Sequence, residues 1–69
     1  MEIIKLREDY IKLGKALKAT GCVSSGVEAK EVILSGLVKV NGNIEIKRGK
    51  KLYLGDIVSY NGVQIKIEN

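Results

Sequence analysis

The chain has 69 residues, of which 45 % are apolar, so it forms one globular domain with a small core. Its formal net charge is +4, and no apolar run exceeds the three residues of stretches such as Val32 to Leu34, which excludes a transmembrane helix. The N-terminus lacks a signal-peptide core, and Cys22, the one cysteine, cannot form an internal disulfide. We therefore expect a cytoplasmic protein held together by packing.

The first thirty-six residues predict one strand and two helices. Residues 2–6 are rich in β-branched side chains and indicate a strand, and a polar turn follows at residues 7–9. From Tyr10 the apolar residues recur at helical spacing until Gly21, which is a natural helix terminator. The buried positions of this helix would be Tyr10, Leu13 and Leu17, whereas Lys12, Lys15 and Lys18 would share another side.

A second helix is predicted from Ser25 to Gly36. Ser25 and Glu28 have the spacing of a capping box, in which the side chain of each residue accepts a hydrogen bond from the backbone N–H of the other. Gly36 favours the left-handed conformation that ends a helix. The apolar stripe predicted to be buried consists of Ala29, Val32, Ile33 and Leu37.

The remaining residues predict a small antiparallel sheet. Short runs of β-branched and aromatic residues (LVKV, NIEI, LYL, IVSY and VQIKI) alternate with turn signals. Asn41-Gly42 and Asn61-Gly62 suit tight hairpins, which require positive φ, and Gly55-Asp56 marks a further turn. The fold class is therefore α+β: a single domain of residues 1–69, with an N-terminal strand and two short helices packed on a small antiparallel sheet.

Enzymatic chemistry finds little support in the composition. Without a histidine the commonest general base is missing, and one cysteine without histidine excludes ordinary Cys/His zinc sites. Cys22 is better interpreted as a packing residue, and Asp56 as a turn residue. The glycines form no phosphate-loop or dinucleotide fingerprint. We expect no catalytic residue, no metal, no cofactor and no small-molecule substrate.

Positive charge is concentrated in the middle of the chain. Residues 10–51 carry nine Lys or Arg against three acids, whereas the rest of the chain carries three Lys or Arg against five acids. Four of the five residues of the segment KRGKK, residues 47–51, are cationic. Like charges this close repel one another, which indicates a polyanionic partner. The absence of Trp and Phe argues against a membrane surface.

The order and spacing of these motifs over residues 10–60 resemble the RNA-binding domain first described in small-subunit ribosomal protein S-four. The matching residues are Gly21, Ser24-Ser25, Gly36, Val38-Lys39-Val40-Asn41-Gly42 and Gly55-Asp56. The small stand-alone bacterial members are more similar still, through Gly26-Val27-Glu28-Ala29-Lys30 and the basic stretch from Lys47 to Leu52. The resemblance implies binding of structured RNA, often ribosomal, without catalysis or a cofactor.

Two positions depart from the family pattern. Many members have Arg where this chain has Gly26, and the first helix often opens Arg-Leu-Asp where this chain has Lys12-Leu13-Gly14. A charge is thus kept at the first of those three positions and lost at the third.

These considerations predict a basic, RNA-binding face. Structured RNA is favoured over single strands, because Tyr10, Tyr53 and Tyr60 each lie in an apolar pattern and are expected to pack in the core or to be half-buried. Lys5, Arg7 and Lys66 are assigned to the general surface. The alternatives are a module that docks an acidic protein surface and a targeting domain detached from an RNA-modifying enzyme. The candidate RNA-binding residues are Lys12, Lys15, Ser25, Gly26, Lys30, Lys47, Arg48, Lys50 and Lys51, and we expect the protein to be a monomer.

Overall fold

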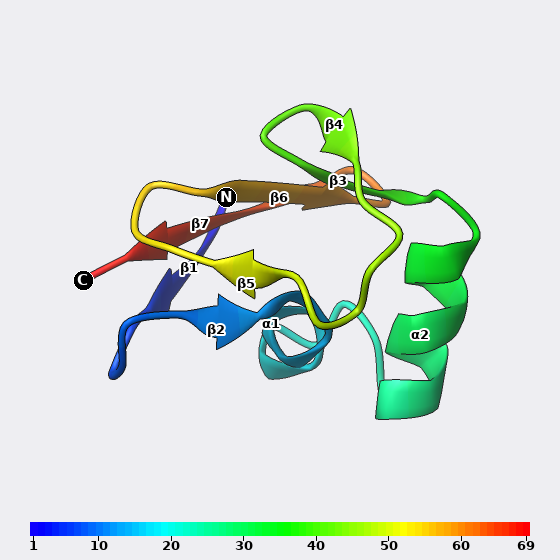
Figure 1. Ribbon diagram of the computed structural model, residues 1–69, viewed down its shortest axis with the longest axis horizontal. Helices are drawn as coiled ribbons and strands as arrows, with labels where there is room; N and C mark the ends of the chain where they lie inside the picture. Colours follow the sequence, from blue (N-terminus) through cyan, green and yellow to red (C-terminus); the bar gives the residue numbers. More distant parts are fainter.

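The computed structural model describes all residues from Met1 to Asn69. Two helices and seven strands follow one another along the chain (Figure 1). They are β1 (Glu2–Lys5), β2 (Ile11–Lys12), α1 (Leu13–Ala19), α2 (Gly26–Leu34), β3 (Val38–Val40), β4 (Asn43–Ile44), β5 (Lys51–Leu52), β6 (Ile57–Tyr60) and β7 (Val63–Glu68). The predicted α+β class is confirmed, and neither helix is long and apolar enough to cross a membrane.

The main sheet has five strands in the order β1-β7-β6-β3-β4. Its hairpins are antiparallel as predicted, with positive φ at Asn41, Gly42, Asn61 and Gly62. The N-terminal strand departs from the prediction, because β1 pairs with β7 in parallel and makes the sheet mixed. Residues 2–5 thereby lie beside residues 65–68.

The first helix begins later than the periodicity suggested. Ile11 and Lys12 form β2, which pairs in antiparallel fashion with β5, with Ile11 opposite Leu52 and Lys12 opposite Lys51. This two-stranded ribbon lies apart from the main sheet, and Figure 1 shows it beside α1. The residues directly after Tyr10 therefore form a strand instead of the first helical turn, and their partner β5 lies far along the chain.

The second helix begins where its cap was predicted. The Ser25 hydroxyl accepts a hydrogen bond from the Glu28 backbone N–H at 3.1 Å. Of the predicted stripe, Ala29 and Ile33 are fully buried and Val32 is half-buried. Leu37 contradicts the prediction, since 59 % of it is exposed; it lies beyond the end of α2 and before β3.

One apolar core joins both helices, the main sheet and the ribbon. It contains twelve buried residues: Leu13, Ala16, Leu17, Val23, Ala29, Ile33, Val38, Val40, Leu52, Val58, Ile65 and Ile67. Cys22 and Tyr60 pack at its margin, consistent with the packing roles expected for them. Because every core side chain is apolar, the charged side chains lie on the surface, where they can meet a partner.

Candidate nucleic-acid interface

The segment between β4 and β5 docks on the first turn of α1. The backbone N–H of Leu13 donates to the carbonyl of Lys50 at 2.8 Å, and that of Gly14 donates to the carbonyl of Arg48 at 3.1 Å. These bonds satisfy N–H groups that a helix leaves unpaired at its start. Figure 1 shows this segment, between the labels β4 and β5, passing beside α1. Part of the KRGKK segment is thus fixed against the helix that carries the other lysines.

A groove lies between this segment, α1 and the start of α2. We call it the basic groove; its lining residues are Lys12, Gly14, Lys15, Lys18, Gly26, Ala29, Arg48 and Gly49. Four of them are cationic and none is acidic. The fold therefore brings together four of the predicted site residues from three separate segments of the chain: Lys12, Lys15, Gly26 and Arg48.

The cations of the basic groove have no carboxylate partners within the protein. The structure contains one salt bridge, between Lys66 and Glu68 at 3.9 Å, and it lies in β7. Lys12, Lys15, Lys18 and Arg48 are all exposed. Their mutual repulsion is unrelieved in the free protein, so the groove is suited to a polyanion.

The start of α2 adds backbone groups to one wall of the groove. Gly26 is its first residue, and a Cβ added there would meet nothing within 4 Å. The capping box differs in one bond from the predicted one, because the Glu28 carboxylate accepts from Ser24, at 2.7 Å from its backbone N–H and 2.9 Å from its hydroxyl. These two bonds, the backbone one first, lower the pKa of Glu28 below its ordinary value. The carboxylate is thus turned back along the chain.

The rest of the KRGKK segment points elsewhere. Lys50 and Lys51 line a second hollow, which we call the tyrosine hollow, formed by Val40, Asn41, Asn43, Glu45, Lys50, Lys51, Tyr53 and Asp56. Lys47 and Lys30 are exposed but line neither hollow, and the half-buried Ser25 lines neither as well. The cluster that looks continuous in the sequence is therefore divided between two parts of the surface.

Sequence reasoning missed several side chains that lie at this surface. Lys18 lines the basic groove although it was not among the candidate residues, and its spacing of three from Lys15 was the available signal. Lys5 and Arg7 line a neighbouring hollow together with Lys12 and Lys15. The acidic Glu8 lines the same hollow, but Lys5 and Arg7, which were assigned to the general surface, still bring cations from β1 and the turn after it close to the basic groove.

The three tyrosines differ in exposure in a way that the sequence did not predict. Tyr60 is half-buried against the core, as expected. Tyr10 and Tyr53 are 36 % and 50 % exposed, so they are more open to solvent than the core or half-buried packing that the sequence predicted. Their exposure follows from the ribbon, which turns Ile11 and Leu52 toward the core and the neighbouring side chains outward.

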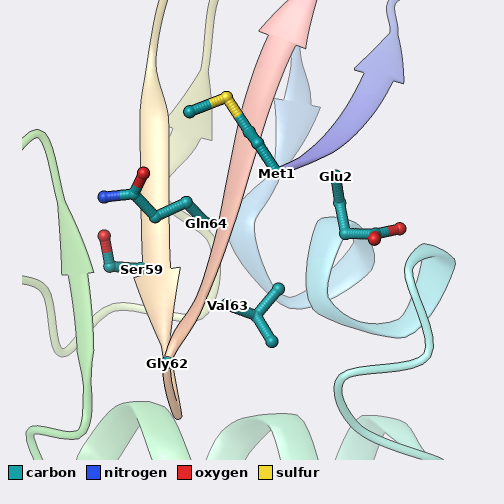
Figure 2. Close-up of a pocket in the computed structure, with 6 residues that line it drawn as sticks. All are labelled: Met1, Glu2, Ser59, Gly62, Val63 and Gln64. Carbon is teal, nitrogen blue, oxygen red and sulfur yellow. The ribbon is translucent and has the colours of Figure 1, made fainter.

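A further hollow lies at the other end of the sheet. It is formed by Met1, Glu2, Ser59, Gly62, Val63 and Gln64, where the start of β1 meets the β6–β7 turn (Figure 2). No lysine or arginine lines it, so it lacks the charge that a polyanion requires. Nowhere in the structure do three or more His, Cys, Asp or Glu side chains gather in a way that could hold a metal ion.

The fold defines a small α+β domain in which two helices and a ribbon cover one face of a mixed sheet. A family model described as S4 domain, which is the S-four domain of the resemblance, matches residues 4–68. The chain therefore belongs to the S4 domain family.

Relatives of similar size support this assignment. YbcJ of Escherichia coli strain K12 is 33 % identical over 61 residues, which cover 88 % of this chain and 87 % of YbcJ. Its solution structure is described as revealing an alfaL motif involved in RNA-binding, and it superimposes with a TM-score of 0.76 at 31 % identity, covering 100 % of this chain and 89 % of that one. A Bacillus subtilis strain 168 relative named "Probable ribosome maturation protein RlbA" is 37 % identical over 59 residues, covering 86 % of this chain and 83 % of RlbA.

Proposed function

We propose that the protein binds structured RNA without catalysis and that the basic groove contacts the phosphate backbone. The observation that carries this proposal is the convergence of Lys12, Lys15, Lys18 and Arg48 on one groove without an acidic residue. The descriptions of YbcJ, which concern RNA binding, and of RlbA, which concern ribosome maturation, favour the same conclusion. The RNA we propose is ribosomal RNA or a ribosome-associated RNA, met in the cytoplasm by a monomer.

Duplex RNA suits this surface for a physical reason. Its major groove is too deep and narrow for side chains to read, so proteins recognise its shape, phosphates and 2′-hydroxyls. Lysine and arginine side chains held by a rigid scaffold meet that requirement. The start of α2 contributes unpaired backbone N–H groups at Gly26, where the lack of a side chain lets a phosphate approach. Ser25 positions this turn by capping the helix, and Lys30 follows one turn later.

Lys47, Lys50 and Lys51 extend the proposed contact surface beyond the groove. All three are exposed, and none has a carboxylate partner. Because they flank Arg48 along the chain but lie outside the groove, they would meet phosphates further along the same RNA. The competing function is a module that docks an acidic protein surface through these same cations.

Salt dependence separates the two functions. Phosphate contacts release condensed counterions, so the logarithm of RNA affinity falls linearly with the logarithm of salt concentration. We would titrate a fluorescent RNA stem–loop with wild type and with the double variant Lys15→Gln, Arg48→Gln over a series of KCl concentrations. The variant should bind more weakly, and its slope should be shallower by about one for each phosphate that is no longer neutralised.

A charge-matched control uses the other face of the main sheet. Lys39 and Lys66 alternate with buried residues of β3 and β7, so their side chains leave the sheet on the side away from the core. Lys39→Gln with Lys66→Gln removes the same charge and should leave the slope nearly unchanged. If both double variants reduced binding equally, net charge rather than the groove would account for affinity. A slope near zero for wild type would favour the protein-docking function. Co-sedimentation with purified ribosomal subunits tests whether the RNA is ribosomal.

A further inference from the structure

The outward face of the β2–β5 ribbon combines two aromatic and two cationic side chains. In the observed register, Ile11 lies opposite Leu52 and Lys12 opposite Lys51, which places Tyr10 and Tyr53 opposite one another just beyond the ladder. Because successive side chains of a strand alternate between faces, Tyr10 and Lys12 share a face, as do Lys51 and Tyr53. The inward positions are Ile11, which packs against the core, and Leu52, which is fully buried.

The two rings form a pair that remains open to solvent. Their centroids are 6.1 Å apart, with planes inclined by 52°. The Lys51 ammonium lies over the Tyr10 ring, 4.8 Å from its centroid, and this is the structure's one cation–π contact. The Tyr53 ring carries no such cation, and Tyr53 is half exposed. Aromatic rings at this exposure offer a flat apolar surface that the core does not use.

Hydrogen bonds hold Tyr53 in place from behind. Its backbone N–H donates to the Asp56 carboxylate at 2.8 Å, and its carbonyl accepts from the Asp56 N–H at 3.0 Å. The second oxygen of Asp56 accepts from the Asn41 side chain at 3.0 Å, which ties this turn to the β3–β4 hairpin. Tyr53 therefore projects from a fixed backbone, so little conformational entropy would be lost on stacking.

The surroundings of the Tyr53 ring suit a nucleotide. The tyrosine hollow places Lys50 and Lys51 beside it, where a phosphate would lie, and adds the exposed side chain of Asn43, which could bond a base edge. Two carboxylates also line it, but Asp56 is bonded as described and Glu45 accepts from the Lys47 N–H at 3.2 Å. The two carboxylates equal the two lysines in number, so the aromatic surface of Tyr53, rather than net charge, distinguishes this hollow, and the hydrogen bonds turn the carboxylate oxygens toward the protein backbone and Asn41.

We propose that Tyr53, backed by Tyr10 and flanked by Lys50 and Lys51, stacks on an unpaired nucleobase of the bound RNA. This inference rests on the proposed function and names its target more closely: a duplex that carries a bulged or looped-out nucleotide. The basic groove holds the paired region and the tyrosine hollow receives the unpaired base. Stacking on an aromatic side chain tolerates any base, so the recognised feature is the unpaired position rather than its sequence.

Two RNAs that differ by one nucleotide test the proposal. One is a stem–loop with a single bulged 2-aminopurine, and the other is the same stem fully paired. Wild type should bind the bulged RNA roughly tenfold more tightly, as expected for one stacked base, and should quench the 2-aminopurine. Tyr53→Leu should lose about this factor on the bulged RNA and nothing on the paired one, whereas Tyr53→Phe should retain both the preference and the quenching.

Controls distinguish stacking from a structural effect. Tyr60→Phe alters a tyrosine that packs against the core and should leave the preference intact. Thermal melts followed by circular dichroism confirm folding, and Tyr10→Leu provides a second test of the ring pair if Tyr53→Leu is unstable. Equal wild-type affinity for the two RNAs, or an equal loss on both RNAs in Tyr53→Leu, would overturn the inference. Salt-dependent binding of the paired RNA would then still support the proposed function, and failure to bind either RNA would overturn both.

Discussion

Arg48 lies directly across Gly14. A Cβ added to Gly14 would fall 2.6 Å from Arg48 Cγ, which is closer than real Cβ atoms approach, and 3.2 Å from its Cδ. Family members often carry an aspartate at this position of the first helix, where this chain departs from the pattern. Here the glycine leaves room for the Arg48 side chain beside α1, and both residues line the basic groove.

Gly14→Ala should therefore displace Arg48 from the basic groove. The clash involves the middle of the arginine side chain, so the whole guanidinium must move. We expect RNA affinity to fall several-fold, with a shallower salt slope, while the melting temperature changes little because alanine is the better helix former. Filter binding and circular dichroism melts measure the two quantities.

A double-mutant cycle isolates this relationship. Arg48→Ala alone should weaken RNA binding, and adding Gly14→Ala to it should bring no further loss, because the displaced side chain is already gone. In that background the alanine should also stabilise the helix by up to about 1 kcal/mol. Additive losses of affinity in the double variant would contradict the displacement mechanism.

Gly26→Asp tests the wall of the groove formed by α2. The position has open space, and acidic residues are tolerated in the first turn of a helix, so folding should survive. A negative charge would enter a groove that otherwise has none, and RNA affinity should drop several-fold. Gly26→Asn is the matched control, because it adds nearly the same volume without charge. Similar affinity for the two variants would mean that charge at this wall does not matter.

The Glu28 carboxylate predicts a pH dependence of stability. Its hydrogen bonds with Ser24 lower its pKa in the folded state, so the folded state favours the charged form. The ionised carboxylate therefore stabilises the folded protein above the unfolded-state pKa, and this stabilisation is lost as the pH falls through the lower folded-state pKa. The window therefore lies in the acid range, at and below the ordinary glutamate pKa.

Denaturant unfolding of wild type and Glu28→Gln across that range measures the effect. The amide oxygen of glutamine can accept the same bonds but does not titrate, so the wild-type advantage at neutral pH should shrink toward acid pH. Glu31→Gln removes the same charge from the same helix and serves as control; its side chain makes no hydrogen bond in the structure. Parallel stability curves for wild type and Glu28→Gln would contradict the role of the carboxylate.

Local signals predicted the local features of this fold. Ser25 caps α2 because its short side chain brings the hydroxyl oxygen within reach of an unpaired N–H of the first turn, and the Asn-Gly pairs form the turns because both positions need positive φ. Features that depend on distant residues were not predictable in this way. The pairing of β2 depends on residues 51–52, and the parallel pairing of β1 depends on residues 65–68.

In the candidate site, too, the sequence predicted the kind of residue but not its arrangement in space. The composition of KRGKK indicated a polyanion, but it could not indicate that Arg48 faces α1 whereas Lys50 and Lys51 line the tyrosine hollow. That separation arises because the segment turns as it crosses α1: the carbonyls of Arg48 and Lys50 accept from the first N–H groups of α1, and the chain then leaves the helix to enter β5. Lys18 escaped detection because its relevance depends on how α1 packs against α2.

The position of β7 also bears on how the protein is made. This strand is the last along the chain, yet it lies between β1 and β6 in the sheet. Once synthesised, β1 consequently has no strand partner until residues 63–68 have also been synthesised and released. Contacts of such high sequence separation form slowly, because the intervening chain must first be closed into a loop. Folding of the sheet is therefore completed only after translation of β7, and Ile4, the β1 side chain that packs against the core, stays uncovered until then.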